Sequence, residues 1–326
     1  MLAELTNGLV ERGHEVAILM PPQGDIEFNI KANIIRTLEP TIQEGDYPYS
    51  DYIISNYYTT VQAAELASIN GKGMHIRLSL CYEPVFLPEN DVTFPTYHVT
   101  SKIIVLSKWH QELINLNHGI KGKIVPVGVS SEFRNLQIRQ PKDKIEVSAV
   151  IRKPEGGFSW HREQNYLLNH LDIVKQRYPN IQLNLFCPPD ELASSPILQK
   201  IKGMGNYRFY TPANDVELCY HYNQADIFVN SSTYDTASLP GLEAMKCGAA
   251  LVTTYAGGNL DYCNPDENCL LSYRYENNLS DNIIRLIHNP NLRQTLASRG
   301  EVEASNWTWE RSIDRFLSAI NSFALG

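Results

Sequence analysis

The amino-acid sequence predicts an α/β protein with two doubly wound parallel sheets. Short runs rich in Val and Ile alternate with helix-like runs along the whole chain, which is the pattern of parallel α/β sheets. Several of these runs are apolar at every position, as expected for strands that helices cover on both faces. The length of 326 residues corresponds to about two domains of ordinary size.

The N-terminal half begins on a helix rather than on a strand. Leu2, Leu5 and Leu9 repeat at helical spacing, and Gly13 is placed to end this helix. The strands of this half are expected at Val16–Met20, Tyr52–Ser55, His75–Leu80, Ile103–Ser107 and Ile124–Val127. A doubly wound sheet normally opens on a strand and a glycine-rich turn. We expect both to be missing here, so that the flanking strands close against each other or the domain is poorly ordered.

The C-terminal half repeats the alternation of strands and helices. Its strands are expected at Ile145–Ile151, Ile181–Phe186, Tyr207–Tyr210, Ile227–Asn230 and Ala249–Thr254. Asn214 is expected to cap a helix, with Glu217 three residues on. The chain ends in an amphipathic helix that Asn306 is expected to cap, with an apolar face formed by Ile313, Phe316, Leu317 and Ile320. We therefore predict an N-terminal domain at 1–130, a linker at 131–144, a C-terminal domain at 145–305 and a helix at 306–326 that packs back toward the N-terminal domain.

Composition excludes several classes of protein. The chain has 28 Lys and Arg against 36 Asp and Glu, a net charge of -8, which argues against a general nucleic-acid binder with an extended cationic face. No apolar run is long enough to span a bilayer, and the first residues do not resemble a secretory signal. The six cysteines form no CxxC pair and are interpreted as reduced thiols. We expect a cytoplasmic protein, compatible with peripheral contact to a membrane.

The most informative segment spans residues 225–258. A buried strand is expected to lead into a polar loop, and Pro240 is expected to open the next helix. Free backbone N–H groups before a helix can hold a phosphate. Asp235 and Glu243 flank this loop with seven residues between them. From spacing alone, Glu243 complements the helix dipole and Asp235 caps the loop, while contact with sugar hydroxyls remains the alternative.

This segment resembles the signature of the family 4 glycosyltransferases, which have the GT-B architecture of two facing Rossmann-like domains. The family pattern is a Glu, seven residues and a second Glu, followed by an Ala-Met-x-x-Gly stretch and a Gly-Gly turn. Here Asp235 takes the first position and Glu243 the second, followed by Ala244, Met245 and Gly248, then Gly257 and Gly258. RGHEV, KIIVLSKWH, KIVPVGVSSEF and NWTWERSIDRFL also match, so the resemblance covers essentially the whole chain.

The resemblance implies a binding site for a nucleotide-sugar in the C-terminal domain. In the family an Arg and a Lys hold the diphosphate. Here Arg152 matches the Arg, but the usual Lys-Gly is absent, so we expect Arg162 as the second cation with Lys153 as the competitor. The resemblance further implies that Asp235 contacts the donor sugar, that Glu243 contacts ribose or sugar hydroxyls, and that the amides of Ser238 and Leu239 hold the sugar phosphate.

The acceptor side is expected in the N-terminal domain. HIRLSLCYEPVFLPEN resembles a subgroup of bacterial polysaccharide-synthesis transferases, with Tyr82 and Glu83 at the carboxyl end of a strand, where ligands bind in open α/β sheets. Glu83 could orient or deprotonate an acceptor hydroxyl. The alternative is a structural turn that Pro84 fixes.

We therefore predict a retaining glycosyltransferase that moves a sugar from a nucleoside-diphosphate sugar to a saccharide or lipid-linked acceptor. The Asp-x-Asp pattern that would hold a divalent metal under a sugar diphosphate is absent, so we expect no metal and no other cofactor. The alternatives are a non-catalytic nucleotide-sugar-binding remnant or subunit that lacks the first strand, and a sugar-nucleotide epimerase.

Overall fold

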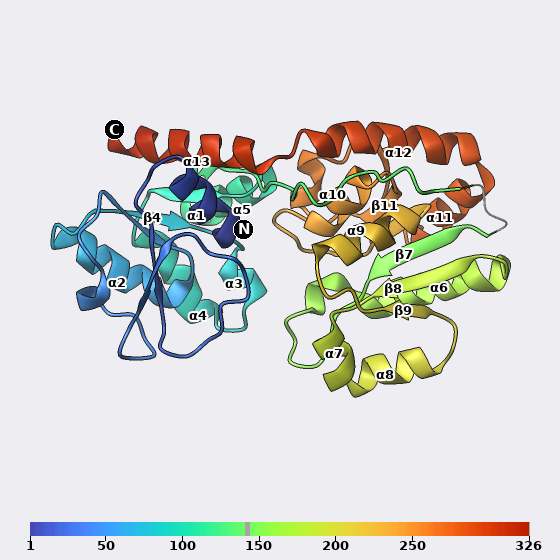
Figure 1. The fold of residues 1–326 in the computed structure, drawn as a ribbon, viewed down its shortest axis with the longest axis horizontal. Coiled ribbons are helices and arrows are strands. Elements are labelled where there is room, and N and C mark those ends of the chain that lie inside the picture. Colours follow the sequence, from blue (N-terminus) through green and yellow to red (C-terminus); the bar gives the residue numbers. More distant parts are fainter. Residues whose placement is uncertain (141–143, 326) are drawn as a thin grey trace. The chain divides into compact units, whose positions relative to one another are not determined.

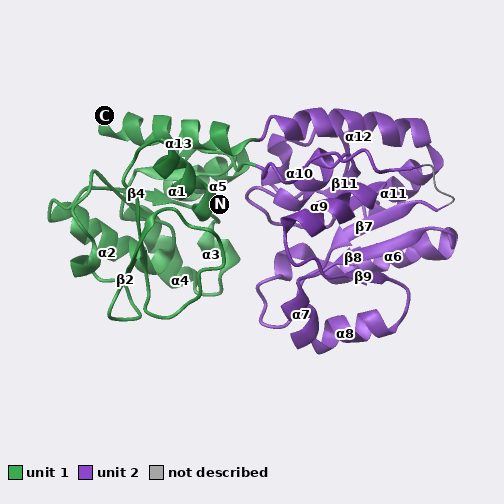
Figure 2. Cartoon of the chain, in the orientation of Figure 1, with its two compact units in different colours: residues 1–128, 308–326 green, residues 129–307 purple. Residues whose placement is uncertain are grey.

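The computed structural model describes residues 1–140 and 144–325, which form two compact units. Unit 1 consists of Met1–Gly128 and Thr308–Gly326, and unit 2 consists of Val129–Trp307 (Figure 2). The boundaries predicted at residues 130 and 306 lie within two residues of these divisions. As expected from the sequence, the C-terminal helix belongs to the same unit as the N-terminal half of the chain.

Unit 2 contains a parallel six-stranded sheet with the strand order β12-β11-β10-β7-β8-β9 (Figure 1). Its strands are β7 (Glu146–Val150), β8 (Gln182–Phe186), β9 (Arg208–Tyr210), β10 (Ile227–Asn230), β11 (Ala250–Thr254) and β12 (Cys269–Ser272). Its helices are α6 (Gln164–Arg177), α7 (Pro189–Ser194), α8 (Pro196–Gly203), α9 (Asp215–Gln224), α10 (Leu239–Lys246), α11 (Leu279–His288) and α12 (Pro290–Ser305). All five strands predicted for this half are confirmed, and β12 is an addition.

Helices cover both faces of this sheet. Val147 of β7 and Ile227 of β10 are buried in a cluster that includes residues of α6 and α11. Alternate residues of a strand point to opposite faces, so Phe228 lies on the other face. There its ring packs against Tyr222 of α9, with the ring centroids 5.2 Å apart. The predicted burial of the strands on both faces is confirmed.

Unit 1 contains two separate parallel sheets. A four-stranded sheet has the order β3-β4-β5-β6, and a two-stranded sheet joins β1 to β2. The strands are β1 (Ala17–Met20), β2 (Asn33–Arg36), β3 (Tyr52–Ser55), β4 (Met74–Leu78), β5 (Ile103–Val105) and β6 (Lys123–Ile124). The helices are α1 (Leu2–Glu11), α2 (Tyr58–Ile69), α3 (Glu83–Phe86), α4 (Asn90–Thr93), α5 (Lys108–His118) and α13 (Trp309–Ala324).

The sequence predicts either closure of the flanking strands β1 and β3 against each other or poor order of the domain, and the first of these is wrong. No ladder joins these two strands within the described residues. Instead, Leu19 of β1 packs through its side chain against a buried cluster that contains Ile53 of β3 and Ala64 of α2. Side-chain packing therefore holds the two-stranded sheet against the rest of unit 1, and β2 is an addition to the predicted strands.

The core of unit 1 lies between the four-stranded sheet and a pair of helices. Leu5 of α1 and Phe316 of α13 are buried with Ile76 of β4 and Ile104 of β5. The predicted apolar face of the last helix is confirmed, because Ile313, Phe316 and Ile320 are buried and Leu317 packs against the same cluster. The cap is not Asn306, which follows α12, but Thr308, whose hydroxyl accepts the N–H of Arg311.

The segment predicted as a linker is instead part of unit 2. The guanidinium of Arg139 donates hydrogen bonds to the carbonyl oxygens of Ala225, Tyr222 and Cys247. The amide of Leu136 donates to the side chain of Asn223 at 2.7 Å. These polar side chains, which suggest a solvated linker in the sequence, satisfy backbone groups at the ends of helices. Residues 141–143 of the predicted linker lie outside the described residues.

Within the described residues, no helix combines the length and the apolar character that crossing a membrane requires.

Candidate functional site

The loop between β10 and α10 is shaped by the carboxylate of Asp235. Its Oδ1 accepts the backbone N–H of Ser238 at 2.8 Å and that of Ala237 at 3.3 Å. These bonds stabilise Ser238 at a φ of 56°, a left-handed conformation that is unusual for a residue other than glycine. Asp235 is therefore the loop cap that its spacing suggests, and one of its oxygens is committed to the loop.

The Gly-Gly turn lies directly against this loop. The amide of Gly258 donates to the Asp235 carbonyl oxygen at 2.8 Å. A Cβ added at Gly258 would lie 2.1 Å from the Thr236 carbonyl oxygen, so only glycine allows the two segments to approach this closely. The signature residues Asp235 and Gly258 thus build one rigid corner at the carboxyl ends of β10 and β11.

Ser238 cannot hold a phosphate with its backbone amide, contrary to the sequence prediction. That amide already donates to Asp235. The Ser238 hydroxyl is bonded to Asn230 at 3.0 Å, and its carbonyl oxygen accepts the Tyr262 hydroxyl at 2.8 Å. The next amide, of Leu239, donates to no acceptor in the part of the chain that the structure describes. Leu239 is therefore a backbone donor that remains available at the start of α10.

Two of the three predicted cations have side chains bonded to residues of α7. Arg152 donates from Nε and Nη2 to both carboxylate oxygens of Glu191. Glu191 also accepts the amide of Lys153 at 2.7 Å, and the Lys153 ammonium lies 3.3 Å from the Ser194 hydroxyl. Both side chains are therefore directed to α7, and the positive charge of Arg152 is compensated.

Arg162 is in a different environment. It lies in a short 3-10 turn whose backbone is tied to the segment after β10, because the Ser231 hydroxyl donates to the Arg162 carbonyl oxygen at 2.6 Å. Its half-buried guanidinium makes no hydrogen bond or ion pair with the residues described. Burial lowers the pKa of Arg162, and the negative charge of Asp235 partly offsets this effect. The site thus contains a partly buried cation near the loop that precedes α10, without a bonded acceptor among the described residues.

Glu243 lies beyond the first turn of α10, in which a carboxylate would complement the helix dipole, and bonds to α9. Its Oε2 accepts the hydroxyl of Tyr222 at 3.2 Å. Burial raises the pKa of Glu243 from 4.5 to about 7, while the Tyr222 hydrogen bond and the charge of Arg162 act in the opposite direction. A carboxyl group that titrates near neutrality can accept or donate a hydrogen bond, which is suited to the hydroxyls of a sugar.

The raised pKa of Glu243 makes stability depend on pH. Because the native chain retains a proton that the unfolded chain releases between pH 4.5 and about 7, the free energy of unfolding falls as pH rises through this interval. The slope is at most about 1.4 kcal/mol per pH unit. Gln cannot ionise, so we expect Glu243→Gln to be more stable than the wild type above about pH 7 and equally stable below about pH 4.5. Urea unfolding across this range measures the difference, with the exposed Glu267→Gln as control. A constant difference at every pH would contradict the assignment.

The two acceptor-side residues predicted in unit 1 are buried. Tyr82 is 2% exposed, and its hydroxyl bonds to His118 Nε2 at 2.9 Å. Glu83 is 3% exposed and forms an ion pair with Arg77, which is also buried. The second Glu83 oxygen accepts the amide of Tyr58 at the start of α2. Glu83 thus forms a buried ion pair and anchors the start of α2, and its action on an acceptor hydroxyl stays a prediction.

Two residues of the site have no counterpart in the sequence analysis. Tyr222 lies 21 residues before Glu243, and Glu191 lies 39 residues after Arg152. Neither residue belongs to the signature segment. Tyr222 reaches Glu243 because α9 packs on α10, and Glu191 of α7 reaches Arg152 in the segment after β7.

Comparison with known proteins identifies the C-terminal part of the chain. Residues 156–302 match the family described as glycosyl transferases group 1, and this range includes Arg162, Asp235 and Glu243. The chain is 20% identical over 222 residues to alpha-monoglucosyldiacylglycerol synthase of Acholeplasma laidlawii, which covers 65% of this chain. The match spans only about half, 55%, of the length of that relative.

Solved structures with the same fold cover nearly the whole chain. Sucrose-phosphate synthase of Thermosynechococcus elongatus is 18% identical, with a TM-score of 0.78 over 100% of this chain and 93% of that chain. Alr3699/HepE of Anabaena, in complex with UDP and glucose, is 17% identical, with a TM-score of 0.75 over 98% and 95% of the two chains. At this identity the likeness establishes the fold. The family match therefore applies to residues 156–302, and the structural likeness shows that the chain has the GT-B fold of two Rossmann-like units.

Proposed function

We propose that this chain transfers a sugar from a nucleoside-diphosphate sugar to a hydroxyl of a saccharide or lipid-linked acceptor, with retention of configuration and without a metal ion. The observation that carries the proposal is Arg162, a partly buried cation without a bonded acceptor among the described residues that interacts electrostatically with Asp235 in the loop before α10. Burying a charge without a partner is costly, and an anionic ligand would compensate it.

Arg162 and the Leu239 amide supply what a departing diphosphate needs. Negative charge develops on the diphosphate as its bond to the sugar breaks, and donors that are already oriented stabilise that charge. In the proposed reaction the departing diphosphate assists attack of the acceptor hydroxyl from the same face, and no protein nucleophile takes part. The absence of Asp-x-Asp from the sequence supports transfer without metal, since two positively polarised groups would take the place of an ion.

Glu243 would bind hydroxyls of the ribose or of the donor sugar. Its carboxyl group is held by Tyr222 and titrates near neutrality. Asp235 would position the sugar with the oxygen that does not bind the loop, in addition to shaping the loop itself. The complex of Alr3699/HepE with UDP and glucose supports a uridine nucleotide and a hexose as the first ligands to test.

Nucleotide binding is expected to be independent of divalent metal. UDP, GDP or dTDP should raise the melting temperature of the chain, because a ligand that binds only the native state stabilises that state. The rise should be the same in EDTA and in Mg²⁺. Uridine without phosphates should give a smaller shift, since it lacks the charge that Arg162 compensates. A shift that requires Mg²⁺ would show that the diphosphate site is wrongly assigned.

Turnover separates the proposed activity from its alternatives. A transferase releases nucleoside diphosphate rapidly only when an acceptor is present. An epimerase converts the nucleotide-sugar without an acceptor, and a binding subunit shows a thermal shift without turnover under either condition. Sugar transfer with release of the diphosphate is the expected result.

A further inference from the structure

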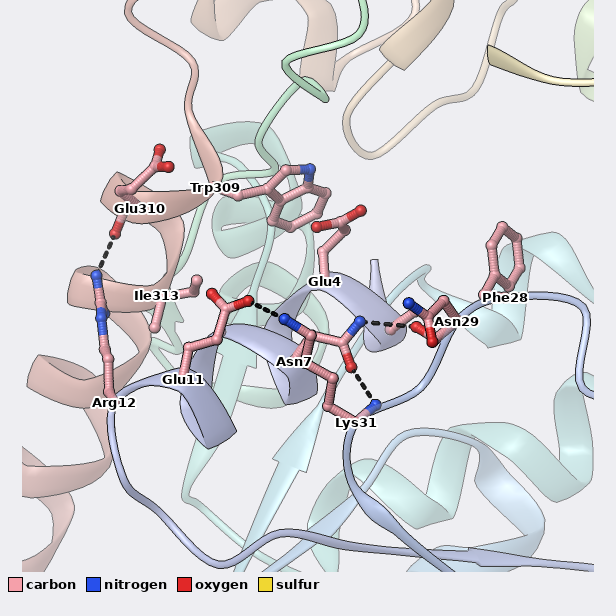
Figure 3. A pocket seen from close by; sticks show the side chains of 12 residues that line it. Glu4, Asn7, Glu11, Arg12, Phe28, Asn29, Lys31, Trp309, Glu310 and Ile313 are labelled. Carbon is pink, nitrogen blue, oxygen red and sulfur yellow. Dashed lines mark hydrogen bonds and ion pairs between the residues drawn. The ribbon is translucent and has the colours of Figure 1, made fainter. Parts of the chain in front are cut away.

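A pocket with a volume of about 430 Å³ lies entirely within unit 1, and no residue of the signature segment lines it (Figure 3). It is bordered by α1, by the start of α13 and by the segment that leads into β2. The residues that line it are Ala3, Glu4, Asn7, Gly8, Glu11, Arg12, Phe28, Asn29, Lys31, Trp309, Glu310 and Ile313. Its size is in the range of pockets that bind small molecules.

The close packing of α1 on α13 gives this pocket a fixed floor. A Cβ added at Gly8 would come within 2.0 Å of Ile313 Cδ1, so the two helices touch where Gly8 lies. Asn7 holds the opposite side, because its amide donates to the Asn29 carbonyl oxygen and its Oδ1 accepts the Lys31 amide, both at 2.7 Å. The segment at 28–31 is thereby attached to α1, and the pocket has a defined shape.

Two aromatic rings border the pocket from different elements. Trp309 comes from α13 and is half-buried, and Phe28 comes from the segment before β2 and is 68% exposed. In Figure 3 the carboxylate of Glu4 lies between these two rings. An exposed Phe in a polar segment is costly to solvate, and a ligand that covers its face would remove this cost.

The charges around the pocket nearly cancel. Glu11 forms an ion pair with Lys31, and Arg12 forms one with Asp314 and also donates to the Glu310 carbonyl oxygen. The three lining carboxylates and two lining cations leave one formal negative charge. The carboxylates of Glu4 and Glu310 bond to no residue that the structure describes. A strongly charged ligand would therefore gain little electrostatic energy in this pocket. A neutral ligand would find hydrogen-bond acceptors, hydrogen-bond donors and aromatic faces there.

We propose that this pocket binds a neutral saccharide of one or two hexose units. Hydroxyl groups both donate and accept hydrogen bonds, and would pair with the Glu4 carboxylate and with the polar groups that surround it. The apolar C–H faces of a hexose would cover Phe28 and Trp309, whose rings present a negative face to polarised hydrogens. The choice of ligand rests on the proposed function, because an enzyme that extends saccharides would hold part of its acceptor or product here.

Titration calorimetry with glucose, mannose, maltose and sucrose tests this proposal. We expect at least one of them to bind the full-length chain. Glu4→Gln and Phe28→Ala should each weaken that affinity by about tenfold or more, because each removes a contact comparable to one charge-assisted hydrogen bond or one buried aromatic face. Both positions are exposed, so neither change should affect folding. Phe158→Ala, which removes an aromatic side chain of unit 2 that is 73% exposed, is the matched control and should leave saccharide affinity unchanged.

Three results would overturn the proposal. The first is that none of the saccharides binds. The second is that the Phe158→Ala control loses as much saccharide affinity as Phe28→Ala. The third is that the polyamine spermidine binds more tightly than any saccharide and that its binding is weakened by Glu4→Gln. Measuring the UDP-induced thermal shift in the same variants keeps the two proposals separate. We expect that shift to remain unchanged, and its absence from the wild type would count against the proposed function rather than against the pocket.

Discussion

Arg162→Met is expected to lower nucleoside diphosphate affinity by about tenfold to a hundredfold. A hydrogen bond to a charged group contributes about 1.5–3 kcal/mol, and every 1.4 kcal/mol is about tenfold in affinity. Turnover should fall by about 10²–10³, because the charge on the leaving diphosphate develops in the transition state. The variant should fold normally, since the guanidinium has no bonded partner among the described residues.

Arg152→Met is the matched comparison. Arg152 already forms an ion pair with Glu191, so binding a diphosphate would require that pair to rearrange. We therefore expect a smaller loss of diphosphate affinity than in Arg162→Met, together with some loss of stability because Glu191 is left without its partner. Titration with UDP and with uridine measures both effects. Equal losses for UDP and uridine in Arg162→Met, or a larger loss in Arg152→Met, would remove Arg162 from the phosphate site.

Glu83→Ala is expected to destabilise unit 1 by about 3–5 kcal/mol, the usual cost of removing one partner of a buried ion pair. The guanidinium of Arg77 is 1% exposed, lies 3.6 Å from the centroid of the Tyr97 ring and donates to the Thr96 hydroxyl at 2.8 Å. Without Glu83 it would be a buried charge with no carboxylate, and the amide of Tyr58 would also lose its acceptor. Urea unfolding, followed by tryptophan fluorescence, measures the loss.

The double variant Arg77→Met with Glu83→Leu distinguishes a structural pair from a catalytic acid. Replacing a buried pair by apolar residues of similar size is often neutral or stabilising, so we expect it to recover most of the stability. If the double variant is stable but inactive, while nucleotide binding is retained, Glu83 acts on the acceptor after all and the structural assignment fails.

Which strands form was largely predictable from the sequence, and the two exceptions have a physical reason. β10 and β11 are buried on both faces and each contains a run of three apolar residues, whereas apolar residues alternate with polar ones in β7 and in the first part of β8. β2 is a short strand with exposed ends in a polar segment, and β12 follows a turn without the usual alternation of a half-buried strand. Both strands form because each pairs with a neighbouring strand, and the sequence pattern of neither strand predicts it.

The sequence by itself determined the fold class, the family signature and the local devices that depend on near neighbours. The cap at Asn214 and the apolar face of α13 are both set within a few residues. Only the tertiary structure decided which charges are available. Arg152 is paired with Glu191, Arg77 with Glu83, and Arg162 with no residue in the described chain. An ion pair depends on distance in space, and residues 39 positions apart carry no local signal of their contact. Burial, which decides whether such a charge must find a partner, is likewise a property of the packed chain.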